Sequence, residues 1–180
     1  METIPYPIIN TLIMLGIAVL QVASLTLLLG LLNVRGFSSV VSFVRSRGMT
    51  ISFLILFASF IGSLYYSEIA GFPACSLCWY QRILLYPQLI LFGAALWKGR
   101  QDVFLYTNTL SAVGLCIALY NIAIQTFQTV STFCDPGGLA VSCLQKYVIG
   151  YGYITIPVMS ATAFALLLLI GWAMSPKMDK

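Results

Sequence analysis

The chain has 180 residues, of which 60% are hydrophobic and only 8% are charged, whereas an average soluble domain is about 45–50% apolar and about 25% charged. It therefore cannot cover itself with a polar surface, which excludes a soluble globular enzyme; the net charge of only +4, without a basic cluster, excludes a nucleic-acid binder. Because there is no histidine, serine–histidine and cysteine–histidine hydrolases and histidine-based zinc or haem sites are excluded too.

Five apolar segments approach or exceed the roughly 20 helical residues that a bilayer core of about 30 Å requires. In chain order they cover residues 8–32, 50–67, 79–97, 103–130 and 148–175. The first segment carries no charge and is not preceded by the basic residues of a signal peptide, so we expect it to be retained as a helix. The sequence therefore predicts an all-α integral membrane protein with five spans.

The positions of lysine and arginine predict how these spans are oriented, because short cytoplasmic loops are enriched in both residues. Seven of the nine basic residues share one side of the membrane in this topology: Arg35, Arg45, Arg47, Lys98, Arg100, Lys177 and Lys180. The N-terminus is then outside and the C-terminus inside. Between the first two spans, the apolar spacing of residues 37–44 predicts a short helix on the inner membrane surface or, nearly as well, an ordinary loop.

Four of the five cysteines form two pairs, Cys75 with Cys78 and Cys134 with Cys143, and the topology places both pairs outside. An oxidising compartment allows each pair to form a disulfide. Considered alone, the second pair is explained best as a static staple of an exposed loop, closed by a Pro-Gly turn. The spacing of the first pair is instead typical of a redox-active pair. A four-thiolate zinc site is disfavoured because eight residues separate Cys134 from Cys143.

Cys78 directly precedes the apolar helix that is expected to begin at Trp79. The free N–H groups and the dipole at a helix N-terminus favour a thiolate, so the sequence assigns the low-pKa thiol to Cys78. Arg82 lies one turn further along the same face and would bring a positive charge close to that sulfur. Snorkelling of Arg82 to the interface is the alternative explanation.

Two further features lie in the fourth segment. Cys116 is about 14 residues, or roughly 20 Å, below the outer end of its helix, so we expect it to be a small packing residue rather than a redox partner. Asn121, Gln125 and Gln128 form a polar stripe at helical spacing. The stripe is explained either by hydrogen bonding between helices or by a polar wall beside the cysteines.

The run CSLCWYQR at residues 75–82, at the head of a membrane helix and followed by Pro87, closely resembles the disulfide bond formation protein B (DsbB) family. The outer cysteine pair and residues 156–164 are similar to that family's second loop and last helix. The resemblance implies a four-helix transmembrane redox bundle. Residues 50–176 would form this bundle, residues 1–49 would add an N-terminal helix and a basic inner loop, and residues 177–180 would be a cytoplasmic tail.

The resemblance also implies an activity, that of a protein-disulfide:quinone oxidoreductase in the bacterial cytoplasmic membrane. Such an enzyme reoxidises a DsbA-like, thioredoxin-fold thiol oxidase outside the membrane and passes electrons to ubiquinone or menaquinone. By position, the partner would attack Cys134, and Cys143 would then join Cys75. Cys78 would be released as a thiolate against the quinone, with Arg82 near a quinone oxygen. The implied activity would support disulfide bond formation in other proteins outside the membrane.

The sequence departs from the best-studied pattern of that family in three respects: the extra first helix, the closely spaced loop pair, and Gln81 in place of an acidic residue found in many relatives. Two other functions are compatible with parts of this pattern. In a vitamin K epoxide reductase-like enzyme the active Cys-x-x-Cys would follow the loop cysteines, whereas here it precedes them. A non-enzymatic membrane scaffold stapled by two disulfides would leave Arg82 and the spacing of Cys75 and Cys78 unexplained.

Overall fold

The computed structural model describes residues 7–32, 34, 36–100, 102–128, 143–144 and 146–175. In these ranges the regular elements are helices: α1 (Pro7–Leu31), α2 (Ser38–Leu64), the π-helical turn η1 (Tyr65–Ile69), α3 (Ser76–Lys98), α4 (Val103–Phe127) and α5 (Ile156–Ala173). The predicted all-α class is therefore confirmed. Cys134, Arg35, Lys177 and Lys180 lie outside the described residues.

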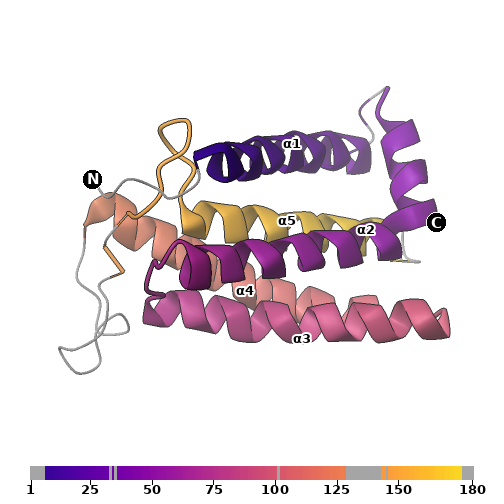
Figure 1. Cartoon of the computed structure of the whole chain (residues 1–180). Helices are drawn as coiled ribbons and strands as arrows, with labels where there is room; N and C mark the ends of the chain where they lie inside the picture. The colour runs from indigo at the N-terminus through magenta and orange to yellow at the C-terminus, as the bar shows by residue number, and fades with distance from the viewer. Residues whose placement is uncertain are drawn as a thin grey trace.

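The helices lie side by side in a bundle with α5 at its centre (Figure 1). α5 packs against α1, α2 and α4, while α3 is held between α2 and α4. The interior of the bundle is filled by large apolar side chains such as Phe92 and Phe164, both almost completely buried. The extra helix α1 is thus packed along one side of the four remaining helices, in contact with α2 and α5.

Four helical stretches are long and apolar enough to cross a membrane: Pro7–Leu31, Ser38–Ile69, Val103–Phe127 and Ile156–Ala173. The chain is therefore a multi-pass membrane protein. The third expected span, α3, has 23 residues and a length of about 34 Å, but the polar side chains of Gln81, Arg82 and Gln88 make it less apolar than the others. The fifth span and the orientation of the chain stay predictions.

A helix at residues 37–44 is confirmed from Ser38 onward, and the alternative of an ordinary loop is wrong. It is not a separate element, because α2 continues from Ser38 into the second expected span and therefore begins earlier than residue 50. Figure 1 shows the first turns of α2 crossing the end of the bundle before the helix continues along it. At Gly48 a Cβ would lie 2.9 Å from Met174 Sδ and 3.2 Å from Ile170 Cγ2, so glycine permits close packing of α2 against the end of α5.

The last span also begins later than expected, at Ile156 rather than at residue 148. Tyr151 and Gly152 have φ angles of 48° and 83°, which an α-helix cannot accommodate. They form a turn closed by backbone bonds between Gly150 and Ile154. Pro157 then falls in the first turn of α5, where its missing N–H is tolerated.

Candidate functional site

The sulfur atoms of Cys75 and Cys78 lie 3.1 Å apart at the N-terminus of α3, and both residues are free thiols. Cys75 is the N-cap, with an extended backbone, and Cys78 lies in the first turn of the helix. Cys75 is only 6% exposed. The short spacing at a helix start therefore brings two thiols into contact at a protected position.

The contacts that favour a thiolate converge on Cys75, which precedes α3. The hydrogen bond from the Cys78 thiol, assisted by the backbone N–H groups of Cys78 and Leu77, lowers the pKa of Cys75 to about 6 against the opposing effect of burial. The sequence assigned this role to Cys78 because it expected the helix to begin at Trp79. The helix begins at Ser76, so the sulfur at the helix cap is that of Cys75.

Cys143 lies close to this pair. It is disulfide-bonded and 1% exposed, and it belongs to the same apolar cluster as Cys75, Leu77 and Ile124. Two cysteines that are 68 positions apart in the sequence therefore share one cluster. The predicted pairing of Cys134 with Cys143 concerns a residue outside the described ranges and stays a prediction.

Cys116 takes no part in this cluster. It is a free, exposed residue of α4, so the expectation that it is a small packing residue is wrong. The sequence could not predict whether Cys116 faces into or out of the bundle, because α4 is apolar on most of its circumference.

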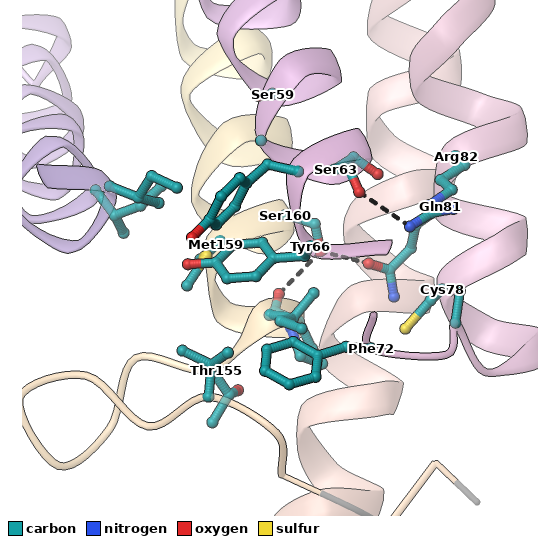
Figure 2. A pocket seen from close by; sticks show the side chains of 18 of the residues that line it. Ser59, Ser63, Tyr66, Phe72, Cys78, Gln81, Arg82, Thr155, Met159 and Ser160 are labelled. Carbon is teal, nitrogen blue, oxygen red and sulfur yellow. Dashed lines mark hydrogen bonds between the residues drawn. The ribbon is translucent and has the colours of Figure 1, made fainter. Parts of the chain in front are cut away.

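Arg82 is held between α3 and α2. Its Nη2 donates a hydrogen bond to the backbone oxygen of Ser63 at 3.2 Å, and its guanidinium carbon lies 5.3 Å from the centroid of the Trp79 ring. Among the described residues no carboxylate forms a salt bridge with it. Figure 2 shows Arg82, Gln81 and Cys78 on one stretch of α3, beside Ser63. Within the described ranges, the positive charge is thus oriented by neutral partners and by no acidic side chain.

Gln81 is the second polar group on this stretch, and it is 5% exposed. Its Oε1 accepts a hydrogen bond from the hydroxyl of Ser160 on α5, whereas its Nε2 is buried without a hydrogen-bond partner among the described residues. Figure 2 shows the amide nitrogen on the side of Cys78. Ser160 was missed as a functional residue because only the arrangement of α3 and α5 within the bundle brings the two side chains together.

The polar stripe of α4 is divided between two roles. Asn121 is fully buried, and its Nδ2 lies 3.8 Å from the sulfur of Cys78, a distance compatible with a weak N–H···S hydrogen bond. Gln128 instead ends α4 with a φ of 52° and donates from Nε2 to the backbone oxygen of Gln125 at 2.7 Å. The hypothesis of a polar wall beside the cysteines therefore applies to Asn121 and not to Gln128.

These groups border a cavity of about 760 Å³, which lies within the usual size range of small-molecule sites. Cys75, Cys78, Gln81 and Arg82 line one part of it, and most of the remaining wall is apolar. η1 contributes Tyr65 and Tyr66 to the wall. Within the described residues there is no cluster of three or more potential metal ligands of the cysteine, aspartate, glutamate or histidine type.

Comparison with known proteins identifies the family. The family model "Disulfide bond formation protein DsbB" matches residues 45–174. The chain belongs to the DsbB family. The "SPbeta prophage-derived disulfide bond formation protein B" of Bacillus subtilis is 43% identical over 130 residues, which are 71% of this chain and 86% of that protein. No solved structure gives a significant match.

Other DsbB-family relatives carry related names. The "Probable disulfide formation protein C 2" of Bacillus anthracis is 32% identical over 128 residues, which cover 71% of this chain and 89% of that protein. The "Probable disulfide formation protein C" of Halalkalibacterium halodurans is 35% identical over 116 residues, which cover 64% of this chain and 84% of that protein. The resemblance drawn from residues 75–82 is confirmed, and α1 lies before the part that the DsbB family model matches.

Proposed function

We propose that the protein is a membrane protein-disulfide:quinone oxidoreductase that reoxidises a DsbA-like, thioredoxin-fold thiol oxidase. The partner would act outside the bacterial cytoplasmic membrane, and the electrons would pass to ubiquinone or menaquinone. One observation carries this proposal: the Cys75–Cys78 pair borders a cavity whose wall also holds the cation of Arg82 and the amide nitrogen of Gln81, which has no hydrogen-bond partner among the described residues.

The residues of this cavity fit a quinone head group. A quinone has a flat apolar ring and two carbonyl oxygens, which accept hydrogen bonds. Arg82 and Gln81 are donors on one stretch of α3, and Gln81 Nε2 is buried with its hydrogen-bonding capacity unused within the described structure. We expect these two residues to hold the carbonyl end of the ring. A bound quinone would supply a two-electron acceptor next to the dithiol.

The thiol chemistry begins with two exchanges, and the second thiol of the partner later releases Cys134 by closing the partner's own disulfide. A thiolate of the partner attacks Cys134, the Cys134–Cys143 bond breaks, and Cys143 leaves as a thiolate. Cys143 then attacks Cys75 in the oxidised Cys75–Cys78 pair, that bond breaks, and the electron pair goes to Cys78. The common cluster of Cys143 and Cys75 supports the second exchange. Asn121 Nδ2 and the nearby Arg82 would stabilise the negative charge left on Cys78.

The orientation of the chain is part of the proposal. With α3 as a fifth span, the N-terminus and both cysteine pairs lie outside and the C-terminus lies inside. The described basic residues Arg45, Arg47, Lys98 and Arg100 support this arrangement. The first two lie in the N-terminal half of α2, and the other two lie at or just after the C-terminal end of α3, at the opposite end of that helix from Cys75. The length of α3, 23 residues, is sufficient for a span.

The proposal is tested by anaerobic quinone reduction by the purified protein, driven by a reduced thioredoxin-fold dithiol. Cys78→Ala and Cys134→Ala should each abolish turnover, and Cys78→Ala should accumulate a disulfide between Cys134 and the partner. The matched control is Cys116→Ala, since Cys116 is exposed on α4. Undiminished turnover in Cys78→Ala would contradict the proposal and favour a non-enzymatic membrane scaffold.

A further inference from the structure

The cavity beside the cysteines extends to the helix that the DsbB family model does not include. Five residues on one face of α1 line it: Ile9, Ile13, Gly16, Ile17 and Leu20. Their spacing of four, three, one and three residues is that of a single helical stripe. Apart from glycine, every side chain in this stripe is apolar. One wall of the cavity is therefore provided by a segment outside residues 45–174.

α1 is held in a defined rotation by contacts on the helix face that adjoins this stripe. The hydroxyl of Tyr66 donates to Asn10 Oδ1 at 2.9 Å, and the hydroxyl of Tyr153 donates to Gln21 Oε1 at 2.6 Å. Met14 is 3% exposed and packs against Tyr65 and Tyr66. The apolar stripe thus faces the cavity because α1 is fixed at both ends of the stripe by polar side chains of other elements.

Two glycines keep space open in this part of the cavity. Gly16 on α1 and Gly62 on α2 both line it, and at each of them an added Cβ would meet no atom within 4 Å. Glycine costs about 1 kcal/mol relative to alanine in a helix, so neither position is explained by helix stability. In Figure 2, Tyr66 and Met159 stand between α1 and the stretch of α3 that carries Cys78 and Arg82.

We propose that the space between α1 and α2 holds the polyprenyl tail of the quinone, so that α1 selects for tailed quinones. This inference rests on the proposed function. Its basis is the continuity of one cavity that is polar at Gln81 and Arg82 and apolar at Gly16 and Gly62, which is the polarity pattern of a quinone head and its tail. A lipid acyl chain shares the chemistry of the tail, and the test below separates the two.

The experiment compares Gly16→Leu and Gly62→Leu with the wild-type protein. The substrates are menadione, which has no tail, and a menaquinone with an oligoprenyl tail. A leucine at either position extends into open space and favours the helix, so both variants should fold. The control is Leu12→Phe, which adds bulk to α1 at an exposed position that does not line the cavity.

The expected result is a fall of about tenfold in the ratio of kcat/KM for the tailed quinone over kcat/KM for menadione, in both glycine variants. The ratio should stay at the wild-type value in Leu12→Phe. An unchanged ratio in the glycine variants would overturn the inference, as would an equal loss with both quinones, which is the result expected if a lipid acyl chain fills the space. A wild-type protein that reduces neither quinone would instead contradict the proposed function itself.

Discussion

The hydroxyl of Ser160 on α5 donates a hydrogen bond to the side-chain oxygen of Gln81 on α3. This contact fixes which end of the Gln81 amide is available to a ligand, because the oxygen accepts a hydrogen bond whereas the nitrogen has no partner in the described part of the chain. We expect Ser160→Ala to raise the KM for a quinone roughly fivefold while kcat changes less, since a single neutral hydrogen bond contributes about 1 kcal/mol. The measurement is steady-state quinone reduction.

Restoring the hydroxyl separates this positioning role from a packing effect. Ser160→Thr retains the donor and should recover most of the wild-type KM, whereas Gln81→Leu removes the amide and should raise the KM at least as much as Ser160→Ala. If Ser160→Ala and Ser160→Thr were equally impaired, the hydrogen bond to Gln81 would not be the cause.

Among the residues that the structure describes, the partners of the Arg82 cation are a backbone oxygen of Ser63 and the ring of Trp79, and neither carries a compensating negative charge. We expect Arg82→Met to lower kcat/KM for quinone by about ten- to hundredfold, because hydrogen bonds to charged groups contribute about 1.5–3 kcal/mol. Arg82→Lys should lose less, since it keeps the charge. Arg100→Met is the control, because Arg100 is an exposed residue paired with Asp102. Equal activities of Arg82→Met and wild type would support snorkelling as the role of Arg82.

The pKa of Cys75, lowered from 9.0 to about 6, has a direct spectroscopic consequence. In a reduced variant with alanine at Cys116, Cys134 and Cys143, the ultraviolet absorbance of the thiolate should appear with a midpoint near pH 6. The lowered pKa stabilises the folded, reduced protein fully above pH 9.0, and this contribution declines as the pH falls and is lost below about 6.

The Cys78→Ala variant tests the cause of this shift. The hydrogen bond from the Cys78 thiol is the largest contribution, so its removal should raise the pKa of Cys75 toward 9.0 while the backbone donors keep part of the effect. A midpoint near 9.0 in the protein that retains both thiols would show that Cys75 is not the stabilised thiolate.

The features that the sequence predicted are those encoded by consecutive residues. The apolar runs predicted the helices, and the Cys-x-x-Cys-x-x-x-Arg pattern identified the stretch of α3 that borders the cavity. The start of α3 was misplaced by three residues, because the choice of N-cap depends on the extended backbone of Cys75 and not on hydropathy. That small error moved the stabilised thiolate from Cys75 to Cys78.

Contacts between distant helices could not be predicted in the same way. Ser160 with Gln81 and Asn121 with Cys78 are 79 and 43 positions apart, and each pairing depends on how two helices are rotated against each other. The late start of α5 has a different reason. Tyr151, just before α5, has a positive φ that non-glycine residues seldom adopt, and only its two glycine neighbours, Gly150 and Gly152, mark a turn within the apolar run.

The packing of α4 against α5 gives a last prediction, about stability. At Gly114 an added Cβ would lie 2.5 Å from the ring of Phe164, a fully buried side chain, so alanine cannot fit unless the ring or the helix moves. We expect Gly114→Ala to lower the free energy of unfolding by about 1–3 kcal/mol, as for other overpacked positions. Gly93→Ala is the matched control, because a Cβ there would lie at an ordinary 3.5 Å from Phe53. Thermal unfolding of both variants in detergent measures the difference. Equal stability of the two would mean that α4 and α5 can separate at Gly114 without cost, which would contradict their close packing at the centre of the bundle.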